Sequence, residues 1–338
     1  MTFRVRPANG DDFRAIYQMA KLTGGGFTNL PADRATLVNK LSRSDKSFAR
    51  EGDHQDADLY VFVLEDPKAG KIRGTCQVFG QVGVGQPVYS YHLSTLTQTS
   101  PELGKTFRNH MLSLTTDLEG SSEVGGLFLH PEMRAGGWGS LLARSRYLFI
   151  GQHRARFGDR TLAELRGVMD EAGNAPFWDA LAGRFFGMTF PEADEFNAVH
   201  GTKFIADLMP KTPIYVSLLA ETGRAVMGQP HPTGRAALRM LEQEGFVFDR
   251  YVDIFDGGPT VTARTDDIRT IREARAEKVC AIEEGGATKV LASAGQLKDF
   301  RACCASVKRL PKKGIAIDRE AAELLEIAVG DTVHLVAR

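Results

Sequence analysis

Residues 123–150, EVGGLFLHPEMRAGGWGSLLARSRYLFI, carry the pattern that most constrains how this chain folds. Val124 to Leu129 is an apolar run of the length expected for one buried strand. A glycine-rich turn follows, and after it Leu141, Leu142, Ser145 and Leu148 share one face of a helix. A strand that enters a helix through glycines predicts an α/β fold with an open turn at the helix start.

The turn itself has the properties of an anion site. The first backbone N–H groups of a helix lack partners inside the helix and carry part of a positive charge. Glycines allow the backbone to come within hydrogen-bond reach of an anion. A Rossmann site would sit at the first strand, and a Walker turn would end in Gly-Lys-Ser/Thr, so both fit less well. We therefore expect a pyrophosphate to bind the six residues Arg134, Ala135, Gly136, Gly137, Trp138 and Gly139.

Composition excludes several classes of protein. Lys and Arg number 42 and Asp and Glu number 42, so the formal net charge is zero. That balance argues against a nucleic-acid partner held through phosphate contacts. No apolar run reaches about 18 residues, the length of a membrane span. The first residues lack the apolar stretch of a secretory signal.

The four cysteines, Cys76, Cys280, Cys303 and Cys304, have the spacing of neither a zinc site nor a disulfide framework. Together with the missing signal, this predicts reduced thiols in a cytoplasmic protein without a bound metal. The length of 338 residues suggests two domains, with room for an appendage.

Further elements follow from residue periodicity. We expect strands at 3–7, 59–65, 72–79 and 89–96, and a loop over the polar run 97–106. Residues 230–256 repeat the order of the first half, a helix, a Gly-Phe pair and an apolar strand from Val252 to Phe255. A last unit has a helix from Ala321 to Ile327 and a strand from Val333 to Val336. The repeat suggests an internal duplication.

The glycine turn resembles the acyl-CoA turn of the GNAT acyltransferase superfamily. The chain also resembles bacterial arginine N-succinyltransferases over four long segments: TGGGFTNLP (23–31), GGLFLHPEMRAGGWGSLLARSRYLFI (125–150), FIADLMPKTPIYVSLL (204–219) and EGFVFDRYVDIFDGGPT (244–260). The resemblance implies transfer of succinyl from succinyl-CoA, a co-substrate rather than a tightly bound cofactor, to the α-amino group of L-arginine. It also implies a homo- or hetero-oligomer with a related subunit.

The resemblance implies an α/β fold of tandem GNAT-like halves with mixed sheets. We expect an acyl-CoA-binding half at 1–195, a second half at 196–280 that carries the catalytic histidine, and a small C-terminal α/β unit at 281–338. Another GNAT reaction, with ornithine or a different amine, stays open as an alternative. So does a non-catalytic acyl-CoA-binding subunit.

Amide formation from a thioester needs a group of intermediate pKa for proton transfer, and histidine suits that task. Of the eight histidines, His130, His200 and His231 are candidates. His231 stands between two prolines before a helix, and the resemblance implies that it is the proton donor. The resemblance also places Leu127 in contact with succinyl-CoA, where the strand backbone would meet the thioester oxygen.

Two subsites stay undecided in the sequence. The succinyl carboxylate requires a cation, for which Arg134, Arg144 and Arg166 are candidates. The guanidinium of the substrate requires carboxylates, and the candidates are the pairs Asp170-Glu171 and Asp253/Asp256. Phe177 and Trp178 are expected to be core residues.

Overall fold

The computed structural model describes residues 3–23, 29–310 and 313–338. The chain divides into two compact units. Unit 1 consists of Met1–Gln81, Ser122–Asp159 and Arg264–Arg338, and unit 2 of Val82–Ser121 and Arg160–Ala263. The two units interleave along the chain. The division expected from the sequence, into 1–195, 196–280 and 281–338, instead follows the chain in successive segments. That division, as a statement about duplicated halves, stays a prediction.

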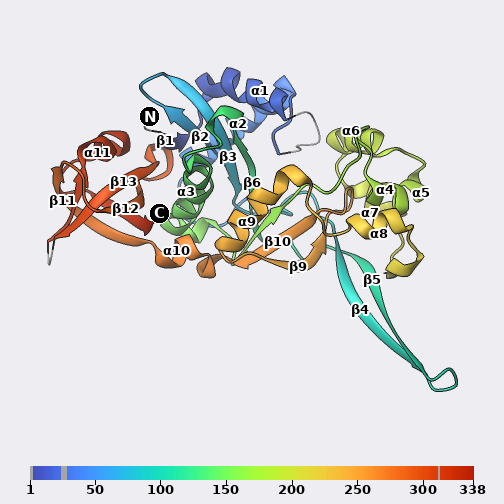
Figure 1. Ribbon diagram of the computed structural model, residues 1–338. Helices are drawn as coiled ribbons and strands as arrows, with labels where there is room; N and C mark the ends of the chain where they lie inside the picture. Colours follow the sequence, from blue (N-terminus) through green and yellow to red (C-terminus); the bar gives the residue numbers. More distant parts are fainter. Residues whose placement is uncertain (1–2, 24–28, 311–312) are drawn as a thin grey trace. The chain divides into compact units, whose positions relative to one another are not determined.

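Unit 1 contains an antiparallel run of four strands, β1 (Arg4–Pro7), β2 (Leu59–Asp66), β3 (Lys71–Phe79) and β6 (Ser122–Leu129). Helices α1 (Phe13–Leu22), α2 (Arg34–Ala49) and α3 (Trp138–Gln152) accompany it (Figure 1). The first six residues of β2 are all buried, as their uninterrupted apolar sequence predicts. The strands predicted at 59–65 and 72–79 are therefore confirmed, and they form the centre of this run.

The C-terminal part of unit 1 adds five strands, β11 (Arg275–Glu283), β12 (Thr288–Ala294), β13 (Arg301–Leu310), β14 (Gly314–Asp318) and β15 (Thr332–Ala337). β11 and β14 pair in parallel, and β13 pairs antiparallel with β1, so the sheet is continuous within unit 1. Helix α11 (Arg319–Leu325) packs on β13. The predicted terminal helix and strand are confirmed, and the mixed pairing confirms the α/β class.

Unit 2 combines a run of paired strands with short helices. Its strands follow the order β7 (Arg160–Glu164), β10 (Pro259–Arg264), β9 (Val247–Val252), β4 (Ser90–Ser100), β5 (Lys105–Thr115) and β8 (Ile214–Tyr215). Helices α4 (Pro176–Ala180), α5 (Gly183–Phe186), α6 (Phe190–His200), α7 (Lys203–Leu208), α8 (Glu221–Val226) and α9 (Arg235–Gln243) complete it. Phe177 and Trp178 are fully buried in its core, which confirms their expected role.

Two local predictions are wrong. The run 97–106 is not a loop, because β4 extends to Ser100 and β5 begins at Lys105, and the two strands pair up to their ends. Nor does a strand cover 252–255, since β9 ends at Val252. There the Asp253 carboxylate accepts the backbone N–H groups of Phe255 at 2.7 Å and Asp256 at 2.8 Å. A side chain that satisfies the backbone locally replaces strand pairing by a turn.

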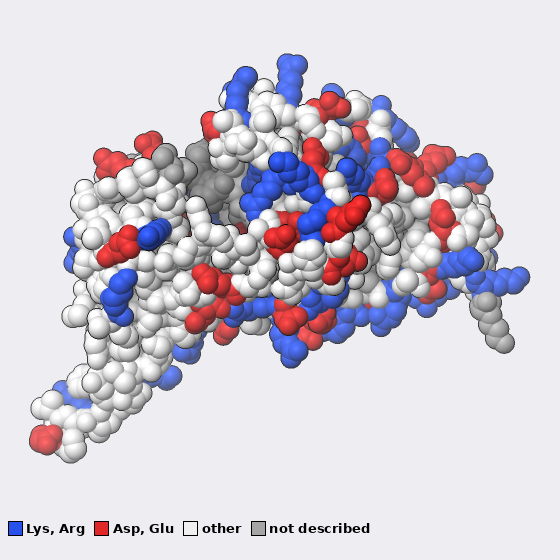
Figure 2. Space-filling view, turned by 180° about the vertical axis from the view of Figure 1, so that it is seen from behind, with Lys and Arg blue, Asp and Glu red and all other residues white. Residues whose placement is uncertain are grey.

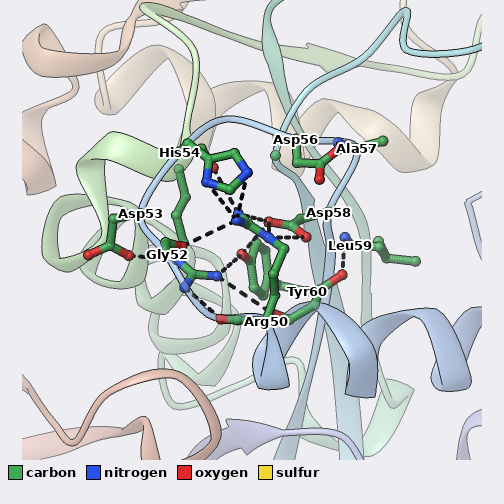
Figure 3. A network of polar contacts seen from close by, with 12 residues as sticks. Arg50, Gly52, Asp53, His54, Asp56, Ala57, Asp58, Leu59 and Tyr60 are labelled. Carbon is green, nitrogen blue, oxygen red and sulfur yellow. Dashed lines mark hydrogen bonds and ion pairs between the residues drawn. The ribbon is translucent and has the colours of Figure 1, made fainter.

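A polar network fastens the ends of α2 and α3 to β2 (Figure 3). Arg50, just after α2, donates to Asp58 at 2.5 Å, and the Tyr60 hydroxyl donates to the same carboxylate at 2.8 Å. Arg156, beyond α3, donates to Tyr60 at 3.2 Å and to Asp53 at 2.9 Å. These bonds fix the far end of the helix whose first turn carries the glycines.

Candidate functional site

The predicted acyl-CoA strand β6 contains a bulge at its centre. Phe128 pairs with Thr75 and Gly125 pairs with Gln77, so Gly126 and Leu127 together face the single residue Cys76 of β3. Gly126 has a φ of 56°, the left-handed conformation that such a bulge assigns to glycine. Because an extra residue interrupts the register, the backbone around Leu127 leaves the regular hydrogen-bond ladder with β3. The resemblance implied a role for Leu127, which stays a prediction, and the bulge was not expected.

The glycine turn is exposed and lies directly at the start of α3. Gly136 has a φ of 88° and Gly137 one of 81°, and Gly137 precedes the first helical residue. A Cβ on Gly136 would lie 2.9 Å from Nε1 of Trp138, which is too close for any other residue type. The Trp138 ring packs on Phe3 with the centroids 4.7 Å apart. The turn therefore keeps an open backbone next to a fixed aromatic ring.

A cation that the sequence did not indicate lies at this turn. Arg338 donates from Nη2 to the carbonyl oxygen of Gly136 at 2.9 Å. The same nitrogen would lie 2.8 Å from a Cβ on Gly137, so it reaches over both glycines. Within the part of the chain that the structure describes, no ion pair involves Arg338. A guanidinium and a helix N-terminus both favour an anion, and no local sequence signal links residues 202 positions apart.

A partly buried polar network lies beside the bulge. Asn29 donates to Glu123 at 3.0 Å and accepts from Gln77 at 2.8 Å, while Lys40 donates to the Asn29 carbonyl. Burial raises the pKa of Glu123, and burial also lowers the pKa of Lys40 to about 8. A carboxyl group with a raised pKa can exchange protons closer to neutral pH than an exposed one.

Glu123 was missed in the sequence analysis. The available signal was one charged residue at the head of an otherwise apolar strand, Ser122–Leu129. Thr28 and the glycines at 24–26, quoted in the resemblance, lie outside the described residues. Asn29, from the same segment, is described and is the centre of the network.

His231 lies in unit 2, where backbone contacts of His231 itself and of the preceding residue fix its position. Its N–H donates to the carbonyl oxygen of Arg166 at 2.7 Å, and the neighbouring Pro230 forms an isolated bridge with Gly167. Its ring nitrogen Nδ1 lies 2.7 Å from the Thr233 hydroxyl and accepts the Thr233 backbone N–H at 3.3 Å. An Nδ1 that accepts a hydrogen bond leaves the proton on Nε2.

The protonation of His231 follows from its surroundings. Burial lowers its pKa, and the positive charge of Arg166 lowers it further. The ring is therefore neutral over a wider pH range than a free histidine and presents an Nε2–H donor. This rigid setting agrees with the expectation for a histidine between two prolines, while its catalytic role stays a prediction at this stage.

The candidate guanidinium ligands differ in what they already bind. Asp256 accepts from the backbone N–H of Gly167 at 2.7 Å and of Gly258 at 2.8 Å, so it joins two loops. One oxygen of Asp253 caps its own turn, as described above, and Asp170 likewise caps a local turn through the N–H of Asn174 at 2.8 Å. Burial raises the pKa of Asp253 and, helped by the charge of Asp253, raises that of Asp256 to about 7.

The candidate succinyl-binding arginines separate in the same way. Arg144 is buried in α3 and donates to the Thr270 hydroxyl at 2.8 Å, so it is part of the packing. Arg134 is exposed in the glycine turn. Arg166 lies in unit 2 beside the His231 backbone, with Nε 2.9 Å from the Met169 sulfur. Leu127 and the turn belong to unit 1 and His231 to unit 2.

Two further properties concern the described residues as a set. They contain no group of three or more His, Cys, Asp or Glu side chains placed to hold a metal ion. Among their helices, none has both the length and the apolar character to cross a membrane.

Comparisons with known proteins cover nearly the whole chain. The model of the arginine N-succinyltransferase beta subunit matches residues 3–270, and that of the C-terminal domain of this subunit matches residues 272–337. Arginine N-succinyltransferase subunit beta of Pseudomonas aeruginosa is 41% identical over 334 residues, which is 98% of this chain and 97% of the relative. Arginine N-succinyltransferase of Escherichia coli is 39% identical, over 98% of this chain and 96% of the relative.

A solved structure agrees with these relatives. The arginine/ornithine succinyltransferase subunit AI of Pseudomonas aeruginosa superimposes with a TM-score of 0.89 at 35% identity. The alignment covers 99% of this chain and 98% of that structure. The fold described above is therefore found along the full length of that subunit.

Proposed function

This chain belongs to the arginine N-succinyltransferase family, an acyltransferase family, and on that premise we propose that it forms N2-succinyl-L-arginine from succinyl-CoA and L-arginine. The α-amino nitrogen attacks the thioester carbon, the new C–N bond forms and the C–S bond breaks. One amine proton leaves the nitrogen, and CoA departs with a proton on its sulfur. The observation that carries the proposal is the bulged strand β6, which leads into an exposed glycine turn.

The turn is proposed to hold the CoA pyrophosphate. Its support is the helix N-terminus of α3, the two glycines with positive φ and the Arg338 guanidinium next to them. Backbone N–H groups and one cation neutralise a pyrophosphate without a surplus of charge in the whole chain, which has a formal net charge of zero. Arg134, Ala135, Trp138 and Gly139 complete this cradle.

Three groups are proposed to act on the reacting atoms. A backbone N–H at the bulge near Leu127 stabilises the oxyanion, since such donors act best when they are fixed in advance. His231 acts as proton donor from its protonated ring, because the imidazolium gives its Nε2 proton to the departing CoA sulfur and returns to the neutral form, whose tautomer the backbone N–H of Thr233 favours. Glu123, whose pKa burial raises, accepts the amine proton.

The amine substrate has one specific alternative. The solved relative is described as an arginine/ornithine succinyltransferase, so ornithine is the first competing substrate to examine. Both amines are cations, and carboxylates such as Asp253 are the groups that suit them. The two Pseudomonas aeruginosa relatives are called subunits, and this favours a subunit role for the chain. We place the reaction in the cytoplasm, where we predict the protein.

A panel of substrates tests the proposal. The purified chain is supplied with succinyl-CoA or acetyl-CoA and with L-arginine, L-ornithine or L-lysine, and the released thiol is measured. We expect the highest kcat/KM for succinyl-CoA with L-arginine. Thiol release with another amine only would reject arginine as substrate, and no release by the chain alone would favour a non-catalytic subunit.

A further inference from the structure

A two-stranded ribbon extends from unit 2 without support from neighbouring strands (Figure 1). We define it as residues 93–100 of β4 and 105–110 of β5. The two strands pair along their full length, from Ser90–Thr115 to Ser100–Lys105. On the outer edges, β9 pairs with β4 at Tyr91 and His92, and β8 pairs with β5 at Met111 and Leu112. Beyond those positions, the described residues provide no strand on either side.

The conformation of Arg250 explains why the edge of β4 is open. Leu93 would be the next residue of β4 to pair with β9, and its partner would be Arg250. Arg250 has a φ of 61°, and the register between β9 and β10 shifts between Thr260 and Val261. A left-handed residue at a bulge turns a strand away from its neighbour. The open edge is thus built into the backbone.

The ribbon carries unusually little charge. β4 contains no Asp, Glu, Lys or Arg over its 11 residues. In Figure 2 the projecting arm is largely white apart from blue and red atoms near its tip, whereas blue and red side chains are dense in the middle and on the right of that face. Ser94 pairs with Met111, and Gln98 pairs with Phe107. Met111 and Phe107 are four positions apart on β5, so their apolar side chains lie on the same face. The Phe107 side chain is 51% exposed, and Leu103 at the tip is 67% exposed.

Such a ribbon is poorly suited to stand alone in water. A two-stranded antiparallel pair is at best marginally stable by itself. Natural edge strands are commonly protected by lysines, prolines or bulges against pairing with another chain. Within the ribbon β4 has none of these residues, and beyond His92 no described strand pairs with its outer edge, where the Arg250 guanidinium donates to the Thr95 hydroxyl at 3.4 Å. These features are expected where another strand covers the edge.

We propose that the ribbon is a contact between two copies of this chain, formed by antiparallel pairing of the β4 edges about a twofold axis. In such an isologous contact each residue faces a residue of the same strand. An uncharged strand satisfies this condition, because no like charges come to lie opposite one another. The β5 edge satisfies it less well, since Lys105 and Arg108 lie there. The absence of a basic stripe on β4 disfavours a nucleic acid as the occupant.

A charge-exchange experiment tests this contact in the full chain. One variant carries Ser94→Lys with Gln98→Lys, and a second carries Ser94→Glu with Gln98→Glu. Both positions face uncharged partners on β5, Met111 and Phe107, so neither variant places a new charge directly opposite an existing one within the ribbon. Sedimentation equilibrium measures the mass, and thermal unfolding followed by circular dichroism checks that each variant is folded.

The wild type is expected at twice its chain mass of 37.0 kDa. Each charged variant alone should dimerise at least about tenfold more weakly, because like charges then meet across the axis, while an equal mixture of the two variants should recover the dimer. A monomeric wild type would overturn the proposal. So would a wild-type dimer that both variants retain unchanged, since the contact would then lie elsewhere on the chain.

Discussion

Substitution of Gly126 by alanine tests the bulge on which the proposed chemistry depends. Alanine would have to keep a φ of 56°, where an L-residue loses roughly 1–2 kcal/mol. Its Cβ would lie 2.8 Å from Cδ of Gln77, so that side chain must move away from Asn29, to which it donates at 2.8 Å. Loss of that bond adds about 1 kcal/mol. We expect the free energy of unfolding to fall by about 2–3 kcal/mol.

The functional effect should exceed what the loss of stability explains. If relaxation of the bulge removes one oxyanion donor, kcat falls by about 10²–10³-fold at temperatures where the variant is fully folded. Urea unfolding measures the stability, and thiol release from succinyl-CoA measures kcat. Gly151→Ala, within α3, is the matched control, because a Cβ on Gly151 would meet the Ile271 side chain at an ordinary contact distance of 3.6 Å. A Gly126→Ala protein with normal kcat would refute the assignment of the oxyanion site to the bulge.

Three further predictions concern the turn, the His231 tautomer and a buried histidine. Arg338→Ala removes the guanidinium, and Gly137→Ala strains the turn. Each change should raise the KM for succinyl-CoA by about tenfold, which corresponds to one charge-assisted bond of about 1.4 kcal/mol, with little change in kcat. KM values equal to that of the wild type would exclude the turn as the CoA site. Thr233→Val should lower kcat and Thr233→Ser restore it, because the hydroxyl lies 2.7 Å from Nδ1, while ¹⁵N NMR should show the same Nε2–H tautomer in both variants, since the backbone N–H of residue 233 still donates to Nδ1; a Thr233→Val protein with wild-type kcat would contradict a role for the hydroxyl. Burial lowers the pKa of His153 from 6.5 to about 4, so between these pH values the unfolded chain binds more protons than the folded chain. The free energy of unfolding should therefore fall by up to about 3 kcal/mol as the pH drops from 6.5 to 4. Urea titrations of His153→Gln should lack this part of the pH dependence.

The sequence predicted well those features that depend on neighbouring residues. Val124 to Leu129 forms a strand, and Gly136 and Gly137 take the backbone conformations that glycine allows, because both properties are local. Trp178 is buried, as a large apolar residue in a helical pattern should be. The rigid backbone of His231 also follows from its two flanking prolines.

The features that were missed depend on contacts between distant segments. Arg338 meets the turn across 202 positions, and Glu123 meets Asn29 across 94. No periodicity in a single sequence encodes such pairs. The end of the ribbon, residues 97–106, was mistaken for a loop for a different reason: these polar residues bury no apolar face in this chain, so the alternation that identifies a strand is weak.

The central claim is that this chain itself transfers succinyl to L-arginine with His231 as donor. Its most direct test is single-turnover thiol release from saturating succinyl-CoA and L-arginine, compared between the wild type and His231→Gln, with the product analysed by mass spectrometry. We predict N2-succinyl-L-arginine from the wild type and a rate about 10²–10⁴-fold lower for the variant, at nearly unchanged affinity for succinyl-CoA. Equal rates for the two proteins, or no succinylated arginine from the wild type, would contradict the account.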